Sequence, residues 1–150
     1  SYEDWDAVMR INLGGCFNMC RAVIEGMRER KWGRIIQISS INGLKGQYGQ
    51  ANYAAAKAGL VGMSKSLAQE VATRGITVNV VAPGFVQTAM TDALGEAQRA
   101  KLLERIPSGR MGKPEDIAAA VAYLSSAEAG WITGQVVGVD GGRSTVRSKG

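Results

Sequence analysis

Histidine is absent from this 150-residue sequence, and cysteine occurs only twice. Without histidine the chain cannot carry a Ser-His-Asp or Cys-His catalytic set, and it lacks the commonest metal ligand. The two cysteines, Cys16 and Cys20, are four residues apart on an expected helix. A disulfide is disfavoured at that spacing, and two thiols alone do not complete a metal site. We therefore expect both to be small buried apolar groups.

Long apolar runs and a basic stripe with interleaved aromatics are also missing. No stretch is long enough to span a membrane, and much of the net charge of +5 lies near the end of the chain, in Arg143, Arg147 and Lys149. Neither a membrane nor a nucleic-acid partner is therefore expected. Free thiols and the lack of a secretion signal predict a cytoplasmic protein. Residues 143–150 are expected to form a flexible tail.

The hydrophobic pattern alternates between helices and buried strands. Short β-branched runs predict strands over 34–39, 76–82 and 135–139. Longer patterns predict helices over 1–30, 50–73, 91–105 and 114–126, the third of them as a candidate lid. Such alternation is typical of an α/β protein with a parallel sheet. Since no repeat or low-complexity linker is visible, we expect one domain over residues 1–142.

Glycine-rich segments interrupt this pattern twice. Gly14-Gly15 falls inside the first helix and costs it about 1 kcal/mol per glycine, so we expect close packing or a bend there. Residues 41–50 carry three glycines and are expected to be a polar loop that lines a site. Ser40, Pro83-Gly84 and Asp140 each follow an expected strand, where parallel sheets bind their ligands.

Tyr53 and Lys57 lie four residues apart, and therefore on one face of the expected helix. A neighbouring ammonium favours the phenolate form of a tyrosine. Such a tyrosine can give a proton to a carbonyl oxygen or take one from an alcohol, while the Ser40 hydroxyl holds the same oxygen. Alone, such a pair also occurs by chance on ordinary amphipathic helices.

The combination of motifs resembles the short-chain dehydrogenase/reductase family across nearly the whole chain. Asn12 precedes Ser40 by 28 residues and Ser40 precedes Tyr53 by 13, which are spacings of this family. The motifs are M-R-I-N-L, I-I-Q-I-S-S, N-Y-A-A-A-K-A-G, T-V-N-V followed by P-G, and D-G-G. The resemblance implies a Rossmann-like doubly wound parallel sheet. This chain would hold its C-terminal portion, about three strands with flanking helices.

The resemblance also implies catalytic roles. Tyr53 would be the proton donor, and Lys57 would support it and hold the nicotinamide ribose. Ser40 would orient the substrate carbonyl, and Asn12 would hold a water in a proton relay at the helix bend.

Cofactor contacts are implied at Pro83, Gly84, Val86 and Thr88, in addition to Tyr53 and Lys57. The family's glycine-rich turn, which holds the cofactor pyrophosphate, is not found in this sequence. The edge of the 34–39 strand would then lack its neighbour, and an open apolar edge invites aggregation or cross-chain pairing.

Within the family, the sequence is similar to acetoacetyl-CoA reductases and to 3-oxoacyl-acyl-carrier-protein reductases. This implies reduction of a 3-oxoacyl thioester, linked to acyl-carrier protein or CoA, with NADPH favoured over NADH as the cofactor. It also implies a homodimer or homotetramer through helices 2–30 and 50–73. Basic residues near the candidate lid, Arg99, Lys101 and Arg105, would suit an acidic carrier or CoA phosphates, or form a solvated face.

Two alternatives stay open. The chain could be an inactive fragment or a helical dimerisation module, because the residues that grip the cofactor pyrophosphate are missing. It could also be a reductase of the same family that acts on a sugar, a steroid or a simple alcohol.

Overall fold

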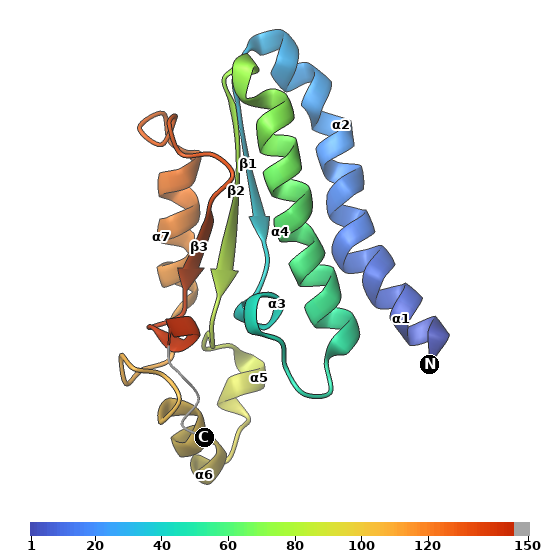
Figure 1. The fold of residues 1–150 in the computed structure, drawn as a ribbon. Helices are drawn as coiled ribbons and strands as arrows, with labels where there is room; N and C mark the ends of the chain where they lie inside the picture. Colours follow the sequence, from blue (N-terminus) through green and yellow to red (C-terminus); the bar gives the residue numbers. More distant parts are fainter. Residues whose placement is uncertain (146–150) are drawn as a thin grey trace.

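A computed structural model describes residues 1–145, apart from the side chains of Met90 and Asp92. Three parallel strands form one sheet: β1 (Gly33–Ile38), β2 (Ile76–Pro83) and β3 (Val136–Val139), in the order β1-β2-β3 (Figure 1). Their β-branched residues pack well on a pleated surface, and β2, the central strand, is buried along nearly its whole length. The expected α/β fold with about three parallel strands is therefore confirmed.

Helices cover both faces of the sheet. Figure 1 shows α2 (Gly15–Arg30) and α4 (Ala51–Val71) on one side and α7 (Pro114–Ser125) on the other. The main core lies under α2 and α4, where apolar side chains of these two helices and of β1 and β2 meet: Cys20, Ile35, Ala68, Val71, Ile76 and Val78. Fully burying an isoleucine or valine side chain contributes about 1.5–3 kcal/mol, so this layer stabilises the fold.

A buried asparagine fixes the entry to β3. Asn79 is 1% exposed, its Nδ2 donates to the Ile132 carbonyl at 2.7 Å, and its Oδ1 accepts from the Gln135 amide at 3.1 Å. Because a buried amide is costly unless it is satisfied, these two bonds hold the turn before β3 in place.

The long N-terminal helix is continuous but changes its winding. Ser1 caps α1 (Tyr2–Met9), since its Oγ accepts from the Asp4 amide at 3.1 Å. A π-helix, Arg10–Gly14, then joins α1 to α2. Such a turn holds one extra residue and locally re-aims the side chains. The helix therefore departs from regular α geometry just before Gly15, whereas neither glycine is closely packed against another element.

Residues 41–50 begin with a short helix, so the expected loop is wrong for its first half. Ser40 caps α3 (Ile41–Lys45), because its Oγ accepts from the Asn42 amide at 3.1 Å. Gly43 lets this helix approach α4: a Cβ at Gly43 would lie 2.8 Å from the Lys57 backbone carbon. This packing is invisible in the local sequence pattern.

The prediction of a single helix over 91–105 is also wrong. The structure has two helices instead, α5 (Ala89–Asp92) and α6 (Glu96–Leu103). The first begins early because the Thr91 hydroxyl bonds both the amide and the carbonyl of Thr88. The second begins anew because Gly95 takes an extended ψ of 154° and acts as its N-cap.

The expected tail is ordered where the structure describes it. Gly141 and Gly142 have φ of 64° and 88°, which glycine adopts readily, and they turn the chain after β3. A 3-10 helix, Arg143–Thr145, follows, and Arg143 is 6% exposed. The rest of the expected tail, residues 146–150, lies outside the described residues.

Residues 1–145 contain no helix long and apolar enough to cross a membrane. Over the same range no group of three or more Cys, Asp or Glu side chains is arranged to hold a metal ion. Both cysteines are free: Cys20 is buried, as expected, whereas Cys16 is only half-buried.

Candidate active site

The carboxyl ends of the three strands bring their following loops together. The Ser39 amide donates to the Val81 carbonyl at 2.8 Å, and the Gly84 amide donates to the Val139 carbonyl at 3.0 Å. In Figure 1, α3, α5 and α6 gather beyond the arrowheads of the strands. The expected site residues that follow β1 and β2 therefore lie at one end of the sheet.

Lys57 joins α4 to the end of β1. Its Nζ donates to the Ile38 carbonyl at 3.0 Å and lies 5.6 Å from the centroid of the Tyr53 ring. Its own carbonyl accepts from the Ser39 hydroxyl at 2.8 Å. Burial lowers the pKa of Lys57, an effect that the neighbouring Cys16 opposes. The Lys57 ammonium has three N–H donors. Within residues 1–145, only the Ile38 carbonyl accepts a hydrogen bond from it.

The two serines after β1 have different tasks. Ser39 is 3% exposed and its hydroxyl is used in the bond to Lys57. Ser40 is half-buried, and its oxygen accepts from the Asn42 amide, so its O–H remains able to donate. Of the two serines, Ser40 is thus the one whose hydroxyl is still able to donate to a ligand.

Asn12 lies in the π-helix, which packs against α4. Its Nδ2 donates to the Val8 carbonyl at 3.2 Å, and its carbonyl accepts from the Cys16 thiol at 3.4 Å. The close approach depends on Gly59, where a Cβ would lie 2.9 Å from Leu13. The structure thus sets Asn12 on the element beside α4, with its Oδ1 left as an acceptor.

The segment after β2 leads from Pro83 to α5. Gly84 has a packing role, since a Cβ there would lie 2.7 Å from Asp140 Cα. Val86 forms a single bridge with Gly112. The side chain of Thr88, which precedes α5, is exposed.

A pocket of about 230 Å³ beside this segment contains polar groups that sequence reasoning missed. Arg110 and Asp116 form an ion pair at 2.7 Å across it. Hydrogen bonds from Arg110, and then from the Lys113 amide, lower the pKa of Asp116 to about 2. The sequence signal available for this ion pair was the presence of acids in the first turn of α7, where the helix dipole stabilises negative charge.

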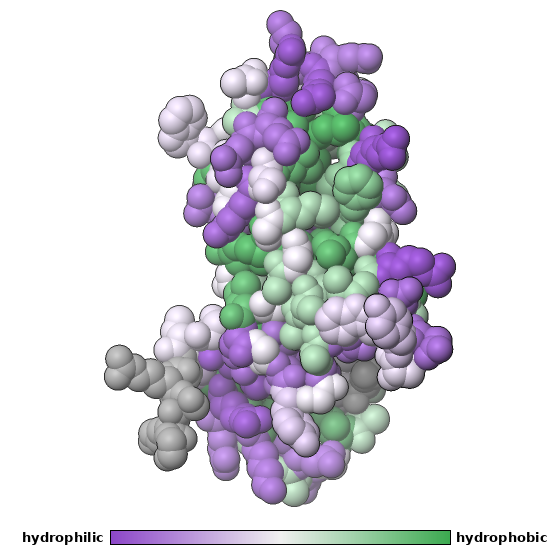
Figure 2. All heavy atoms as spheres, turned by 45° about the vertical axis from the view of Figure 1, so that its right-hand side comes forward, coloured by the Kyte–Doolittle hydropathy of each residue, from purple (hydrophilic) through white to green (hydrophobic). Residues whose placement is uncertain are grey.

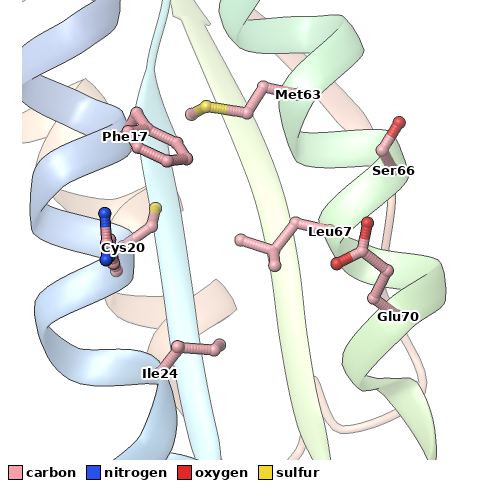
Figure 3. Close-up of a pocket in the computed structure, with 8 residues that line it drawn as sticks. Phe17, Cys20, Ile24, Met63, Ser66, Leu67 and Glu70 are labelled. Atoms are coloured by element: carbon pink, nitrogen blue, oxygen red, sulfur yellow. The ribbon is translucent and has the colours of Figure 1, made fainter.

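A larger apolar pocket of about 270 Å³ lies away from these residues, between α2 and α4 (Figure 3). Its lining is mostly apolar: Phe17, Cys20, Arg21, Ile24, Met63, Ser66, Leu67 and Glu70. Figure 2, which turns the α2 side forward, shows apolar side chains along the middle of this face. No expected site residue lines this pocket.

Comparison with known proteins assigns this arrangement to a family. A family model described as enoyl-(acyl carrier protein) reductase matches residues 1–144. The chain belongs to the short-chain dehydrogenase/reductase family. This membership confirms the resemblance drawn from the spacing of Asn12, Ser40, Tyr53 and Lys57.

The names of the curated relatives refer to a 3-oxoacyl substrate, whereas the description of the family model refers to an enoyl substrate. The chain is 52% identical over 140 residues to the 3-oxoacyl-[acyl-carrier-protein] reductase FabG of Vibrio cholerae. It is 55% identical to FabG of Escherichia coli and 51% identical to FabG of Thermotoga maritima. Each match covers 93% of this chain and 57% of the relative. The chain thus spans a little more than half the length of these relatives.

Proposed function

We propose that this chain carries the catalytic residues of an NADPH-dependent reductase that converts 3-oxoacyl thioesters to 3-hydroxyacyl thioesters. The carrier of the acyl group would be acyl-carrier protein or CoA. The observation that carries the proposal is the position of Lys57, whose Nζ lies beside the Tyr53 ring and donates to the end of β1, the strand that leads through Ser39 to Ser40. The names of the relatives support the substrate class.

The residues fit the nicotinamide end of a dinucleotide. Lys57 has a partly desolvated ammonium with one described acceptor, which suits donation to ribose hydroxyls. Tyr53 stands beside it, and Pro83, Gly84, Val86 and Thr88 would approach the nicotinamide. When bound, NADPH supplies the hydride that reduces the carbonyl carbon.

Residues of this chain would supply the proton that the reduced carbonyl oxygen receives. The Ser40 hydroxyl donates to the substrate carbonyl oxygen and fixes its position. The Tyr53 hydroxyl gives its proton to the same oxygen, and the Lys57 charge stabilises the phenolate that remains. The Oδ1 of Asn12 accepts from a water that returns a proton towards Lys57 and Tyr53.

The proposal also includes an oligomeric state and a cellular location. The apolar groove between α2 and α4 supports a homodimer or homotetramer through residues 2–30 and 50–73 (Figure 3). The two free thiols support a cytoplasmic location. We expect neither a nucleic-acid nor a membrane partner.

A substrate panel on the full-length protein that contains this chain tests the proposal. The panel holds acetoacetyl-CoA, a 3-oxoacyl-acyl-carrier protein, an enoyl thioester, a sugar, a steroid and a simple ketone, each with NADPH and with NADH. We expect turnover of the 3-oxoacyl thioesters with NADPH. Turnover of the enoyl thioester alone would favour the reaction in the family model's description. Turnover of the other ketones alone, or of no substrate, would overturn the proposal.

A further inference from the structure

Three cationic side chains converge beyond the carboxyl ends of the strands. Lys45 is the last residue of α3, Arg105 follows α6, and Arg143 begins the 3-10 helix after β3. Helix α3 packs against Arg143–Thr145. The segment after Arg105 packs on the glycine turn, since the Ser108 amide donates to the Gly141 carbonyl at 3.0 Å. Segments far apart in the sequence therefore bring these cations to one place.

Arg143 forms the base of this cluster and lacks a polar partner. Its guanidinium carbon lies 3.8 Å from the centroid of the Phe85 ring, so the group is stacked and held. Its Nε and Nη1 are buried and have no hydrogen-bond partner within residues 1–145. A buried guanidinium without an acceptor is costly, which is the usual sign of a missing anion or water.

Asp140, the carboxylate whose charge acts on Arg143, has both oxygens bonded to backbone amides. The two oxygens of Asp140 accept from the amides of Gly142 at 2.9 Å and Ser144 at 2.7 Å. In the part of the chain that the structure describes, the ion pairs involve the N-terminus, Arg28 and Arg110, and none of the three cations. The cluster therefore keeps its positive charge.

The three charges also act on one another. Burial, and then the charge of Arg105, lower the pKa of Arg143, whereas Asp140 opposes this shift. Desolvation, and then the charges of Arg143 and Arg105, lower the pKa of Lys45. Like charges held together repel, and a bound anion would relieve that repulsion.

The cluster lies beside the loops that follow β1 and β2. Lys45 ends the short helix that Ser40 begins. Phe85, the ring under Arg143, follows directly after Pro83-Gly84. Both loops that would contact substrate or cofactor thus lead to the same three cations. Lys45 and Arg105 are exposed, so a ligand can reach them.

We propose that Lys45, Arg105 and Arg143 bind the phosphate ester of the pantetheine arm that CoA and acyl-carrier protein share. This inference rests on the proposed function for the identity of the ligand. Arg143 would supply a held, stacked guanidinium at the base, and Lys45 and Arg105 would close over the phosphate from the solvent side. Of the basic residues near α6, only Arg105 takes part in this site.

Direct binding tests the site without catalysis. The full-length protein is titrated calorimetrically with pantetheine 4′-phosphate and with unphosphorylated pantetheine. We expect the phosphate to strengthen binding about tenfold or more, and Lys45→Met or Arg105→Met to remove most of that gain. Lys101→Met, which removes an exposed charge from α6, is the matched control and should change nothing. Equal binding of the two ligands to the unmodified protein would overturn the proposal.

Arg143→Met is the most direct variant, but it removes a buried side chain and can fail to fold. The exposed positions Lys45 and Arg105 keep the proposal falsifiable in that case. If both exposed variants bind pantetheine 4′-phosphate as tightly as the unmodified protein does, the proposed site is wrong.

Kinetic measurements identify which part of the carrier supplies the phosphate. They also test the proposed function separately from the anion site. Lys45→Met should raise KM for acetoacetyl-CoA and acetoacetyl-acyl-carrier protein by similar factors. It should leave KM for the N-acetylcysteamine thioester, which has no phosphate, unchanged. An effect on only one carrier would point to adenosine phosphates or to the carrier surface, and would overturn the shared-phosphate assignment. If no thioester is reduced, the proposed function fails, while the calorimetric comparison still decides whether the anion site exists.

Discussion

Among single residues, Lys57 connects the most parts of the candidate site. Its ammonium bonds the end of β1, its carbonyl accepts from Ser39, and the ring of Tyr53 lies beside it. One residue thus fixes the distance between the serine loop and the tyrosine. Its charge is partly desolvated, which strengthens its electrostatic effect on a neighbouring phenolate.

Replacing Lys57 by Met should change both activity and pH dependence. The folded pKa of Lys57 lies below its ordinary value of 10.5, so the folded protein releases this proton before the unfolded chain does. Stability from this group therefore rises as pH increases from the folded pKa towards 10.5. The Lys57→Met variant should lack that rise and lose activity about 100-fold or more. Urea unfolding between pH 8 and 10.5 checks the first part, and identical pH slopes for the two proteins would contradict it.

The sequence could predict individual residues where chemistry and local spacing agree. Tyr53, Lys57 and Ser40 were proposed in this way, and the structure places Lys57 beside the Tyr53 ring and Ser40 directly after β1. The stacking of Arg143 on Phe85 was missed, because those residues are far apart in the chain and Arg143 begins a basic segment typical of a tail. Long-range contacts of this kind leave no periodic signal.

At the scale of elements, α3 is the helix that the sequence did not predict. Its five residues are too few for a helical period, and its glycine is typical of loops. That glycine, Gly43, instead lets α3 lie against the backbone of α4 at Lys57. The same limitation applies to the π-helix and to the break at Gly95, whereas α4 and α7 were predicted from their length and apolar pattern.

Gly43→Ala should push α3 away from α4. The added Cβ would lie 2.8 Å from Lys57 Cβ and 2.9 Å from the Ala58 nitrogen, both parts of a rigid helix. We expect a loss of about 1–3 kcal/mol in the free energy of unfolding and reduced activity, since Ser40 begins the displaced helix.

Gly62→Ala is the matched control for that variant, because a Cβ there meets nothing within 4 Å. In the middle of α4 it should leave stability unchanged or raise it by up to about 1 kcal/mol. Urea denaturation of both variants makes the measurement. Equal effects of the two substitutions would contradict the packing role of Gly43.

The start of α7 should depend on pH through Asp116. Its Oδ2 accepts from the Lys113 amide at 2.7 Å, and Arg110 completes the ion pair. The folded pKa of about 2 lies below the ordinary 3.8, so this stabilisation is complete above pH 3.8 and is lost as pH falls towards 2. Asp116→Asn should therefore lower Tm at pH 7 but not near pH 2.

Glu115→Gln serves as its control, since Glu115 is an exposed acid in the same helical turn. Glu115→Gln should lower Tm at pH 7 by less than Asp116→Asn does. If Asp116→Asn lowers Tm by the same amount at every pH, the ion pair is not the cause.

In the whole molecule, the parallel sheet and its helical layers follow from the alternating pattern. The sequence predicted that the first strand would lack a neighbour, and β1 is indeed an edge of the sheet within the described residues. Strand order and register depend on contacts between distant segments, so they had to come from the structure. The relatives are longer, since the match covers 93% of this chain but only 57% of each of them.

Assembly should depend on the apolar groove between α2 and α4. Phe17 lines that groove and is 51% exposed. A glutamate there would bury a charge at the proposed interface, so Phe17→Glu should dissociate the oligomer in sedimentation experiments. Met19→Glu, on the same helix but outside the groove, should dissociate it less. An unmodified protein that sediments as a monomer would contradict the proposed assembly.

The most direct test of the account is the turnover of Tyr53→Phe in the full-length protein, with acetoacetyl-CoA and NADPH. This substitution removes only the phenolic oxygen, and Tyr123→Phe, at an exposed tyrosine on α7, is the control. We predict that kcat falls about 100- to 10,000-fold for Tyr53→Phe and is unchanged for Tyr123→Phe. Full activity of a folded Tyr53→Phe variant would contradict the assignment of Tyr53 as the proton donor.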